Sequence, residues 1–164
     1  MVSTRKVLVV YYSETGNTEK MAEFVANGVK EKGIDVTVKK VQDVGARELL
    51  DFDGIIIGSP TYYGLPAASI KKLLDDSVKF HGQLESKVGG AFTSAGNIGG
   101  GNETTIMAII QAMLIHGMII QGTSSGDHYG PVSIGSPDRR AEKLCVSLGK
   151  RVADLVIKLK KSSS

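Results

Sequence analysis

The chain has 164 residues, which is near the usual size of one domain and long enough to bury a core without disulfides or metal ions. Hydrophobic residues make up 41% and charged residues 23%, as in an ordinary globular protein, and the net charge is only +3. We therefore expect a single domain covering residues 1–164, with a disordered tail at 161–164.

The same features argue against several classes of protein. The apolar runs are far shorter than the ~20 residues of a membrane helix, and no signal-peptide pattern follows the N-terminus, so we expect neither membrane insertion nor secretion. A single cysteine, Cys145, cannot form an internal disulfide, which is compatible with a cytoplasmic protein. The basic cluster at 158–161 has no aromatic residue beside it, so we expect no nucleic-acid binding.

The first third of the chain alternates between strand and helix patterns. An apolar run predicts a buried strand over 6–12, and apolar residues four positions apart predict a helix over 17–32. Valines alternate with charged residues over 35–41, which is typical of a second strand at a sheet edge. The connection over 42–52 is expected to hold a short helix.

The middle of the chain repeats this pattern. The apolar run 54–58 predicts a third strand, and Pro66 is suited to the first turn of the helix that follows. The buried stripe of that helix is expected to be Ala67, Ile70 and Leu74. Residues 87–93 predict a fourth strand.

The last third is expected to contain two helices around a fifth strand over 118–121. The first helix follows a glycine-rich loop, and its inward-facing residues are expected to be Ile106, Ile109, Ile110, Met113 and Leu114. Residues 122–137 are expected to be irregular, and Asp138 is suited to cap a long final helix. Cys145 lies on the apolar stripe of that helix, which favours a buried structural thiol over a nucleophile.

This order of elements predicts an α/β fold with three layers. The expected core is a five-stranded parallel sheet in the order 2-1-3-4-5, with helices on both faces and right-handed crossovers. The strand order reverses between the first and third strands, and ligands bind at the carboxyl ends of the strands at such a point.

The first loop, residues 13–18, leads from the first strand into the first helix. It reads Ser-Glu-Thr-Gly-Asn-Thr and contains no lysine or arginine. Gly16 allows the backbone N–H groups to turn toward one point, and the N-terminus of the following helix favours an anion. A single phosphate held by neutral donors fits this loop better than a triphosphate, which normally requires the Gly-x-x-x-x-Gly-Lys pattern. A capped turn with only local hydrogen bonds is the alternative.

Two further loops follow the third and fourth strands. The second loop, residues 59–64, carries Tyr62 and Tyr63, against which a planar ring can stack. The third loop, residues 93–102, has mostly small side chains and many backbone N–H groups. The alternatives are surface packing for the tyrosines and plain mobility for the glycines. No metal-ligand spacing and no catalytic acid, base or nucleophile is apparent.

The first loop resembles the FMN-phosphate signature of flavodoxins, Ser-x-Thr-Gly-Asn-Thr directly after a first strand. Segments 58–64, 92–94 and 99–106, together with His-Gly-Met-Ile-Ile at 116–120, are more similar to the WrbA-type NAD(P)H:quinone oxidoreductases. The resemblance covers nearly the whole chain. It implies a flavodoxin-like fold and a noncovalent FMN as cofactor.

The resemblance also implies a set of cofactor-binding residues. The FMN phosphate would lie on residues 13–18, and the isoalloxazine ring would lie between the second and third loops. His128 falls where WrbA-like proteins have a loop that returns to the flavin, and the alternative is an ordinary loop residue. The full set is Ser13, Glu14, Thr15, Gly16, Asn17, Thr18, Pro60, Thr61, Tyr62, Tyr63, Gly64, Thr93, Ser94, Ala95, Gly96, Asn97, Gly99, Gly100 and His128.

Three functions follow from these resemblances. The leading hypothesis is an electron carrier that serves redox partner proteins, and its rival is a two-electron reductase that uses NAD(P)H and a quinone. A homo-oligomer is compatible with the second, although the chain lacks the long insertions that WrbA-type enzymes usually carry after the second and fifth strands. The third is a binding module of the same fold that has lost its cofactor.

Overall fold

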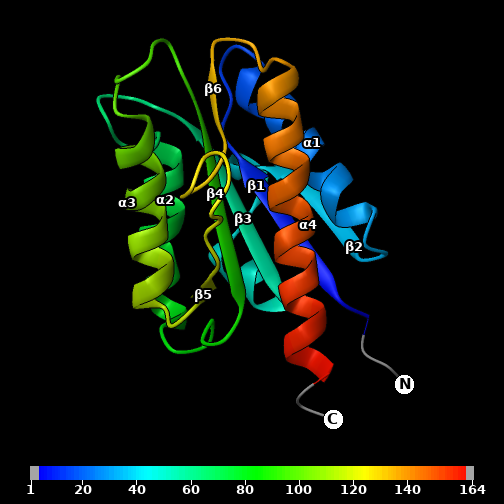
Figure 1. Ribbon diagram of the computed structural model, residues 1–164. Helices are drawn as coiled ribbons and strands as arrows, with labels where there is room; N and C mark the ends of the chain where they lie inside the picture. Colours follow the sequence, from blue (N-terminus) through cyan, green and yellow to red (C-terminus); the bar gives the residue numbers. More distant parts are fainter. Residues whose placement is uncertain (1–3, 162–164) are drawn as a thin grey trace.

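The computed structural model describes residues 4–161, and a parallel β-sheet forms the centre of the molecule (Figure 1). Its strands are β1 (Lys6–Tyr11), β2 (Asp35–Lys40), β3 (Gly54–Pro60), β4 (Val88–Ala95), β5 (Ile119–Ile120) and β6 (Val132–Ile134). The strand order is β2-β1-β3-β4-β5, and β6 pairs with β4. The predicted order 2-1-3-4-5 is therefore confirmed.

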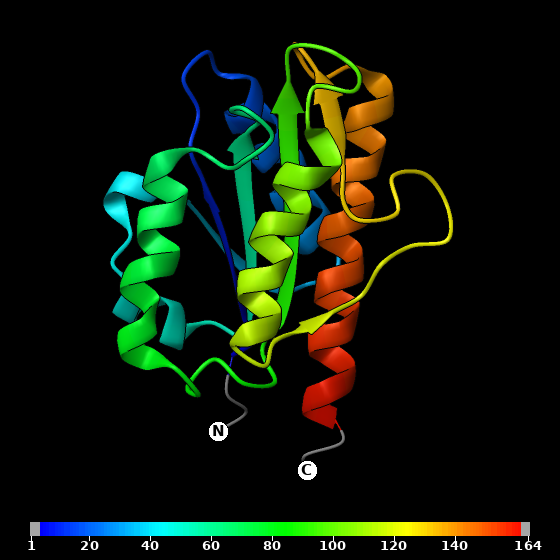
Figure 2. The ribbon, with the colours of Figure 1, turned by 90° about the vertical axis from the view of Figure 1, so that its left-hand side faces the viewer.

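Helices cover both faces of the sheet, as predicted (Figures 1 and 2). One face carries α1 (Asn17–Lys30) and α4 (Arg139–Lys161), and the other carries α2 (Ala68–Asp76) and α3 (Asn102–Ile115). Short 3-10 helices occupy Val41–Asp43, Ala46–Asp51 and Ser77–Phe80. Residues 162–164 of the expected tail lie outside the described part of the chain.

Strand β1 shows why the chain forms three layers. Successive side chains of a strand point to opposite faces, so the apolar run from Val7 to Tyr11 supplies both cores. Leu8 and Val10 belong to the core under α2 and α3, whereas Val7 and Val9 belong to the core under α1 and α4. Strand β2 lies at the sheet edge, as its alternating pattern predicts, and has no fully buried residue.

The outer edge of β4 is paired in two separate places, which the sequence does not indicate. Its first residues pair with β5 and its last three pair with β6, while residues 121–131 leave the sheet between them. The expectation that 122–137 is wholly irregular is therefore wrong. A three-residue strand, Val-Ser-Ile, is too short to show a hydrophobic period.

Several predicted boundaries and one predicted core residue are also wrong. Strands β3 and β4 run two residues further than expected, so their last residues form part of the candidate site. Helix α2 begins two residues after Pro66, and Leu73 is buried more fully than Leu74. Leu114 is 54% exposed because Met113, one position earlier, already faces the core.

No helix within residues 4–161 combines the length and the apolar character that a membrane span requires.

Candidate functional site

The first loop, residues 13–18, opens directly onto the N-terminus of α1. Gly16 has a φ of +91°, which favours glycine, and its N–H donates to Ser13 Oγ at 3.1 Å. Helix α1 has no side-chain cap, so the N–H groups of its first turn remain available to an anion. A Cβ at Gly16 would meet no atom within 4 Å, so open space lies beside the loop.

The acidic side chain of this loop is bonded to the tyrosine that precedes the loop. The hydroxyl of Tyr12 donates to Glu14 Oε2 at 2.6 Å, and this hydrogen bond raises the pKa of Tyr12. The ring of Tyr12 meets the ring of Tyr62 edge-on, with the centroids 6.4 Å apart. Tyr12, which was predicted only as a strand residue, therefore joins the first loop to the second.

Hydroxyl and backbone contacts join the start of α1 to the carboxyl ends of β3 and β4. Thr18 Oγ1 lies 2.8 Å from Ser94 Oγ, and both residues are buried. The N–H of Thr61 donates to the Ser94 carbonyl at 2.8 Å, and Thr61 Oγ1 lies 2.8 Å from Thr93 Oγ1. The three predicted loops thus meet at one end of the sheet, and their hydroxyls hold them in register.

The second loop is a tight turn that presents an exposed aromatic side chain. Tyr62 and Leu65 exchange two backbone hydrogen bonds of 2.9 and 3.0 Å, with Tyr63 and Gly64 at the corner. Tyr63 has a φ of +51°, which non-glycine residues rarely adopt outside functional or constrained sites. Its side chain is fully exposed. The turn therefore holds a tyrosine outward at the edge of the site.

The third loop divides into a buried part and an exposed part. Thr93, Ser94 and Ala95 end strand β4 and are buried, whereas residues 96–100 are exposed. Thr104, at the start of α3, donates from Oγ1 to the Gly64 carbonyl at 2.8 Å and so connects the second loop to the third. Thr104 was not among the predicted site residues, because nothing in its local sequence pattern indicates a partner 40 residues away.

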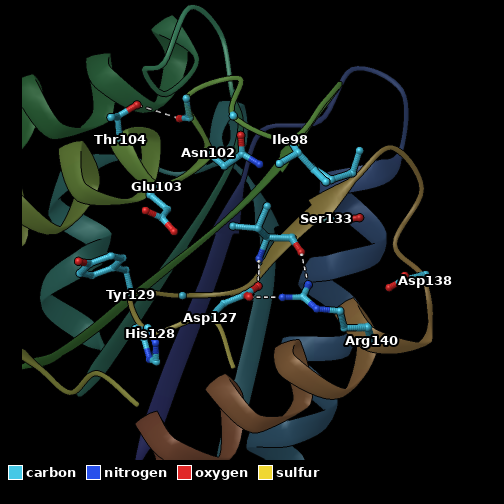
Figure 3. A pocket seen from close by; sticks show the side chains of 15 residues that line it. Ile98, Asn102, Glu103, Thr104, Asp127, His128, Tyr129, Ser133, Asp138 and Arg140 are labelled. Atoms are coloured by element: carbon cyan, nitrogen blue, oxygen red, sulfur yellow. Dashed lines mark hydrogen bonds and ion pairs between the residues drawn. The ribbon is translucent and has the colours of Figure 1, made fainter. Parts of the chain in front are cut away.

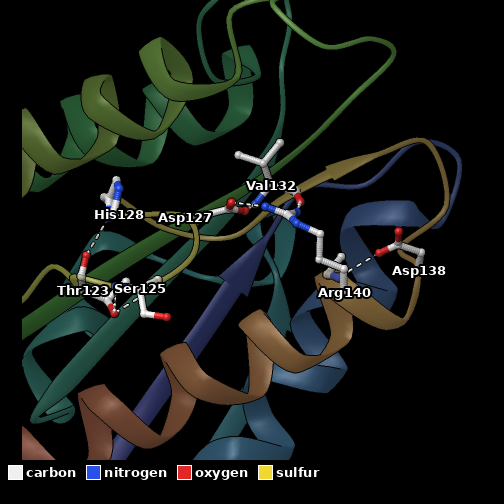
Figure 4. Close-up of polar contacts among 8 residues, drawn as sticks. Thr123, Ser125, Asp127, His128, Val132, Asp138 and Arg140 are labelled. Carbon is white, nitrogen blue, oxygen red and sulfur yellow. Dashed lines mark hydrogen bonds and ion pairs between the residues drawn. The ribbon is translucent and has the colours of Figure 1, made fainter.

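A cavity of about 810 Å³ lies beside the third loop (Figure 3). It lies between the start of α3, the segment 127–134 and the start of α4. Asp127 on its wall forms an ion pair with Arg140 and accepts the Val132 N–H at 2.9 Å (Figure 4). These contacts link the segment 121–131, between β5 and β6, to α4.

His128 lines this cavity. Its Nδ1 is 2.9 Å from the Thr123 carbonyl, within the same excursion, and its side chain is exposed (Figure 4). The third loop forms another wall of the cavity through Gly99 and Gly101. A contact between His128 and the flavin stays a prediction.

The three loops fit FMN by the chemistry of their donors. The first loop offers neutral N–H and hydroxyl groups at a helix N-terminus, which suits a phosphate monoester. The second and third loops offer an aromatic turn and open glycine backbone, which suit a planar ring. A Cβ at Gly96 or Gly99 would also meet no atom within 4 Å.

Comparisons with known proteins agree with this geometry. The profile of the Flavodoxin family matches residues 9–113. A flavodoxin from Aquifex aeolicus is 39% identical over 160 residues, covering 92% of this chain and 86% of that protein.

Proteins named for quinone reduction are also similar to this chain. An NAD(P)H dehydrogenase (quinone) from Archaeoglobus fulgidus is 34% identical over 188 aligned positions, covering 94% of this chain and 98% of that protein. The crystal structure of a flavodoxin, WrbA-like protein from Agrobacterium tumefaciens superposes with a TM-score of 0.80 at 28% identity, covering 94% and 99% of the two chains. The chain therefore belongs to the flavodoxin family, and its cofactor is noncovalently bound FMN.

Proposed function

We propose that this chain is an electron carrier that passes electrons between redox proteins of the cytoplasm. The observation that carries this proposal is the apolar surface around the loops. Tyr62, Tyr63, Leu65 and Ile98 expose between 43% and all of their surface. Exposed apolar side chains gathered at one end of a molecule are typical of a surface where other proteins dock. The lone, buried Cys145 suits a reducing compartment.

The residues of the chain bind and orient the cofactor in this proposal, and FMN supplies the redox chemistry when bound. The first loop and the N-terminus of α1 hold the phosphate. The hydroxyl contacts of Thr18, Thr61, Thr93 and Ser94 fix the three loops relative to one another. Because this network forms within the protein, the ring enters a site that needs little rearrangement.

A two-electron reductase of NAD(P)H and quinone is the second candidate. The Archaeoglobus relative supports it, and the cavity of about 810 Å³ beside the third loop is large enough for a small substrate. The alignment with that relative, at 188 positions, is longer than the 164 residues of this chain, so the relative has insertions that this chain lacks. This difference favours the carrier.

Redox titration separates the two candidates. The FMN-loaded protein is reduced stepwise under argon while the potential and the visible spectrum are recorded. A carrier is expected to show two separate one-electron potentials and negligible oxidation of NAD(P)H with a quinone. A single two-electron potential together with rapid NAD(P)H and quinone turnover would refute the carrier and establish the reductase.

A pair of variants tests the docking surface. Replacing Leu65 with serine removes an exposed apolar side chain beside the second loop, whereas Leu114→Ser removes a comparably exposed side chain of the same kind on α3. We expect Leu65→Ser to slow electron transfer from the reduced protein to cytochrome c about tenfold, with Leu114→Ser unchanged. Equal rates for both variants would show that electrons leave by another surface.

A further inference from the structure

The turn of the second loop has a backbone conformation that its own sequence disfavours. Tyr63 and Gly64 occupy its two corner positions with φ values of +51° and +75°, and Tyr62 and Leu65 exchange the two hydrogen bonds that close it. Positive φ at both corners defines a type I′ turn, in which asparagine, aspartate or glycine is strongly preferred at the first corner. A tyrosine in that position persists only where surrounding contacts hold the turn in place.

Two contacts from the start of α3 hold this turn. Thr104 lies in the first turn of α3, and its hydroxyl donates to the Gly64 carbonyl at 2.8 Å (Figure 3). Gly101 lies so close that a Cβ on it would be 2.4 Å from the Cα of Gly64. Within residues 4–161, no other group donates to the Gly64 carbonyl. The corner of the turn is thus attached to the start of α3.

The proton of the Thr104 hydroxyl is committed to this turn. Its Oγ1 also lies 2.9 Å from the Gly101 carbonyl, but a hydroxyl has only one proton to donate. The Gly101 carbonyl already accepts two hydrogen bonds from Thr105, one from the N–H at 3.0 Å and one from Oγ1 at 2.9 Å, and these use both of its lone pairs. The Thr104 proton is therefore left for the Gly64 carbonyl, which is the nearer acceptor.

The peptide bond between Tyr63 and Gly64 is left uncommitted. Neither the Tyr63 carbonyl nor the Gly64 N–H has a hydrogen-bond partner in the part of the chain that the structure describes. The turn borders the place assigned above to the flavin ring, so both groups are available to the ring. Their position depends on Thr104, because the carbonyl that Thr104 binds belongs to the next peptide bond.

We propose that Thr104 is a positioning residue for the isoalloxazine ring. It acts through the Gly64 carbonyl, by holding the turn so that the uncommitted peptide of Tyr63 and Gly64 meets the ring. Contacts that are fixed before a ligand binds cost less free energy to order on binding. The inference rests on the ring lying beside the second loop, as in the proposed function, and it applies to a carrier and to a reductase alike.

A conservative pair of variants at Thr104 tests this role in the full-length protein. Thr104→Val removes the hydroxyl but keeps the shape of the side chain, and Thr104→Ser keeps the hydroxyl. We expect Thr104→Val to raise the dissociation constant of FMN about fivefold, as for one lost hydrogen bond, and to shift the visible absorption bands of FMN at saturation. Thr104→Ser should restore both. Unmoved bands in Thr104→Val, or a serine variant that behaves like the valine variant, would overturn the proposal.

A second pair of variants moves the turn without changing Thr104. Gly101→Ala places a Cβ against the backbone of Gly64, so the turn must move away from α3. Gly82→Ala is the control, because Gly82 has a similar φ, +84° against +96°, but no atom within 4 Å of its Cβ position. We expect Gly101→Ala to weaken FMN binding about tenfold and to shift the same absorption bands, and Gly82→Ala to do neither. Equal affinities in the two alanine variants would also overturn the proposal.

Two further variants separate this inference from the placement of FMN. Gly16→Val, which acts on the phosphate, should weaken binding but leave the absorption bands in place at saturation. Tyr62→Ala should shift the bands if the ring lies at the second loop. Shifted bands in Tyr62→Ala with unmoved bands in Thr104→Val would refute the role of Thr104 alone. Unmoved bands in both variants would refute the placement of the ring and this inference together.

Discussion

Replacing Gly16 with valine tests the assignment of the phosphate to the first loop. Gly16 has a φ of +91°, so a β-branched residue there should cost about 1–3 kcal/mol of backbone strain. The valine methyl groups would also enter the open space beside the N-terminus of α1, where the phosphate is expected. Loss of one hydrogen bond to a charged group costs about 1.5–3 kcal/mol, so the dissociation constant of FMN should rise roughly ten- to hundredfold.

Gly33 provides the matched control for this variant. It also has a positive φ, +72°, and open space at its Cβ, but it follows the far end of α1. Urea unfolding of the FMN-free proteins should show similar losses of stability for Gly33→Val and Gly16→Val. FMN fluorescence quenching should show weaker binding for Gly16→Val alone. Unchanged affinity in Gly16→Val, or equal loss in both variants, would refute the placement of the phosphate.

Three further predictions concern buried polar groups. Replacing Thr18 with valine keeps the shape of the side chain but leaves Ser94 Oγ without this partner. Urea unfolding should therefore show that the free energy of unfolding falls by about 1–3 kcal/mol. An unchanged midpoint would show that the contact is unimportant. Burial raises the pKa of Cys145 to about 12. A disulfide reagent at pH 8 should therefore label the unfolded protein quickly and the native protein hardly at all. Rapid labelling of the native protein would contradict the burial of this thiol. Burial lowers the pKa of His116, so the unfolded state binds the proton more readily and stability should fall as the pH drops from 7 to 5. His116→Gln should flatten that fall, and an identical slope would show that another group causes it.

The fold could be predicted from the sequence because its signals are regular and long. Strand β1 is apolar from Val7 to Tyr11, and α1 and α4 repeat their apolar residues over several turns. The short strand β6 could not be predicted, because its pairing with β4 depends on contacts made by Gly130 and Pro131 rather than on a local pattern. The inward orientation assigned to Leu114 was wrong for a related reason: α3 is apolar on almost all sides, so its sequence does not reveal which side faces the sheet.

The candidate site could be predicted only loop by loop. The sequence of the first loop indicates a phosphate site by itself, whereas the contact between Thr18 and Ser94 joins residues 76 positions apart. The same limit applies to Thr104, which reaches the second loop across the fold. His116 follows α3, and its bond to Ser77 depends on how α2 and α3 lie together, which no local pattern indicates.

The central claim, that the three loops hold FMN, is tested most directly by titrating the isotope-labelled, FMN-free protein with FMN and following its amide resonances. We predict that the largest shifts fall in residues 13–18, 60–64 and 93–100, with Gly16 among them. Large shifts confined to residues 127–134 in the neighbouring cavity, with residues 13–18 unmoved, would contradict the account.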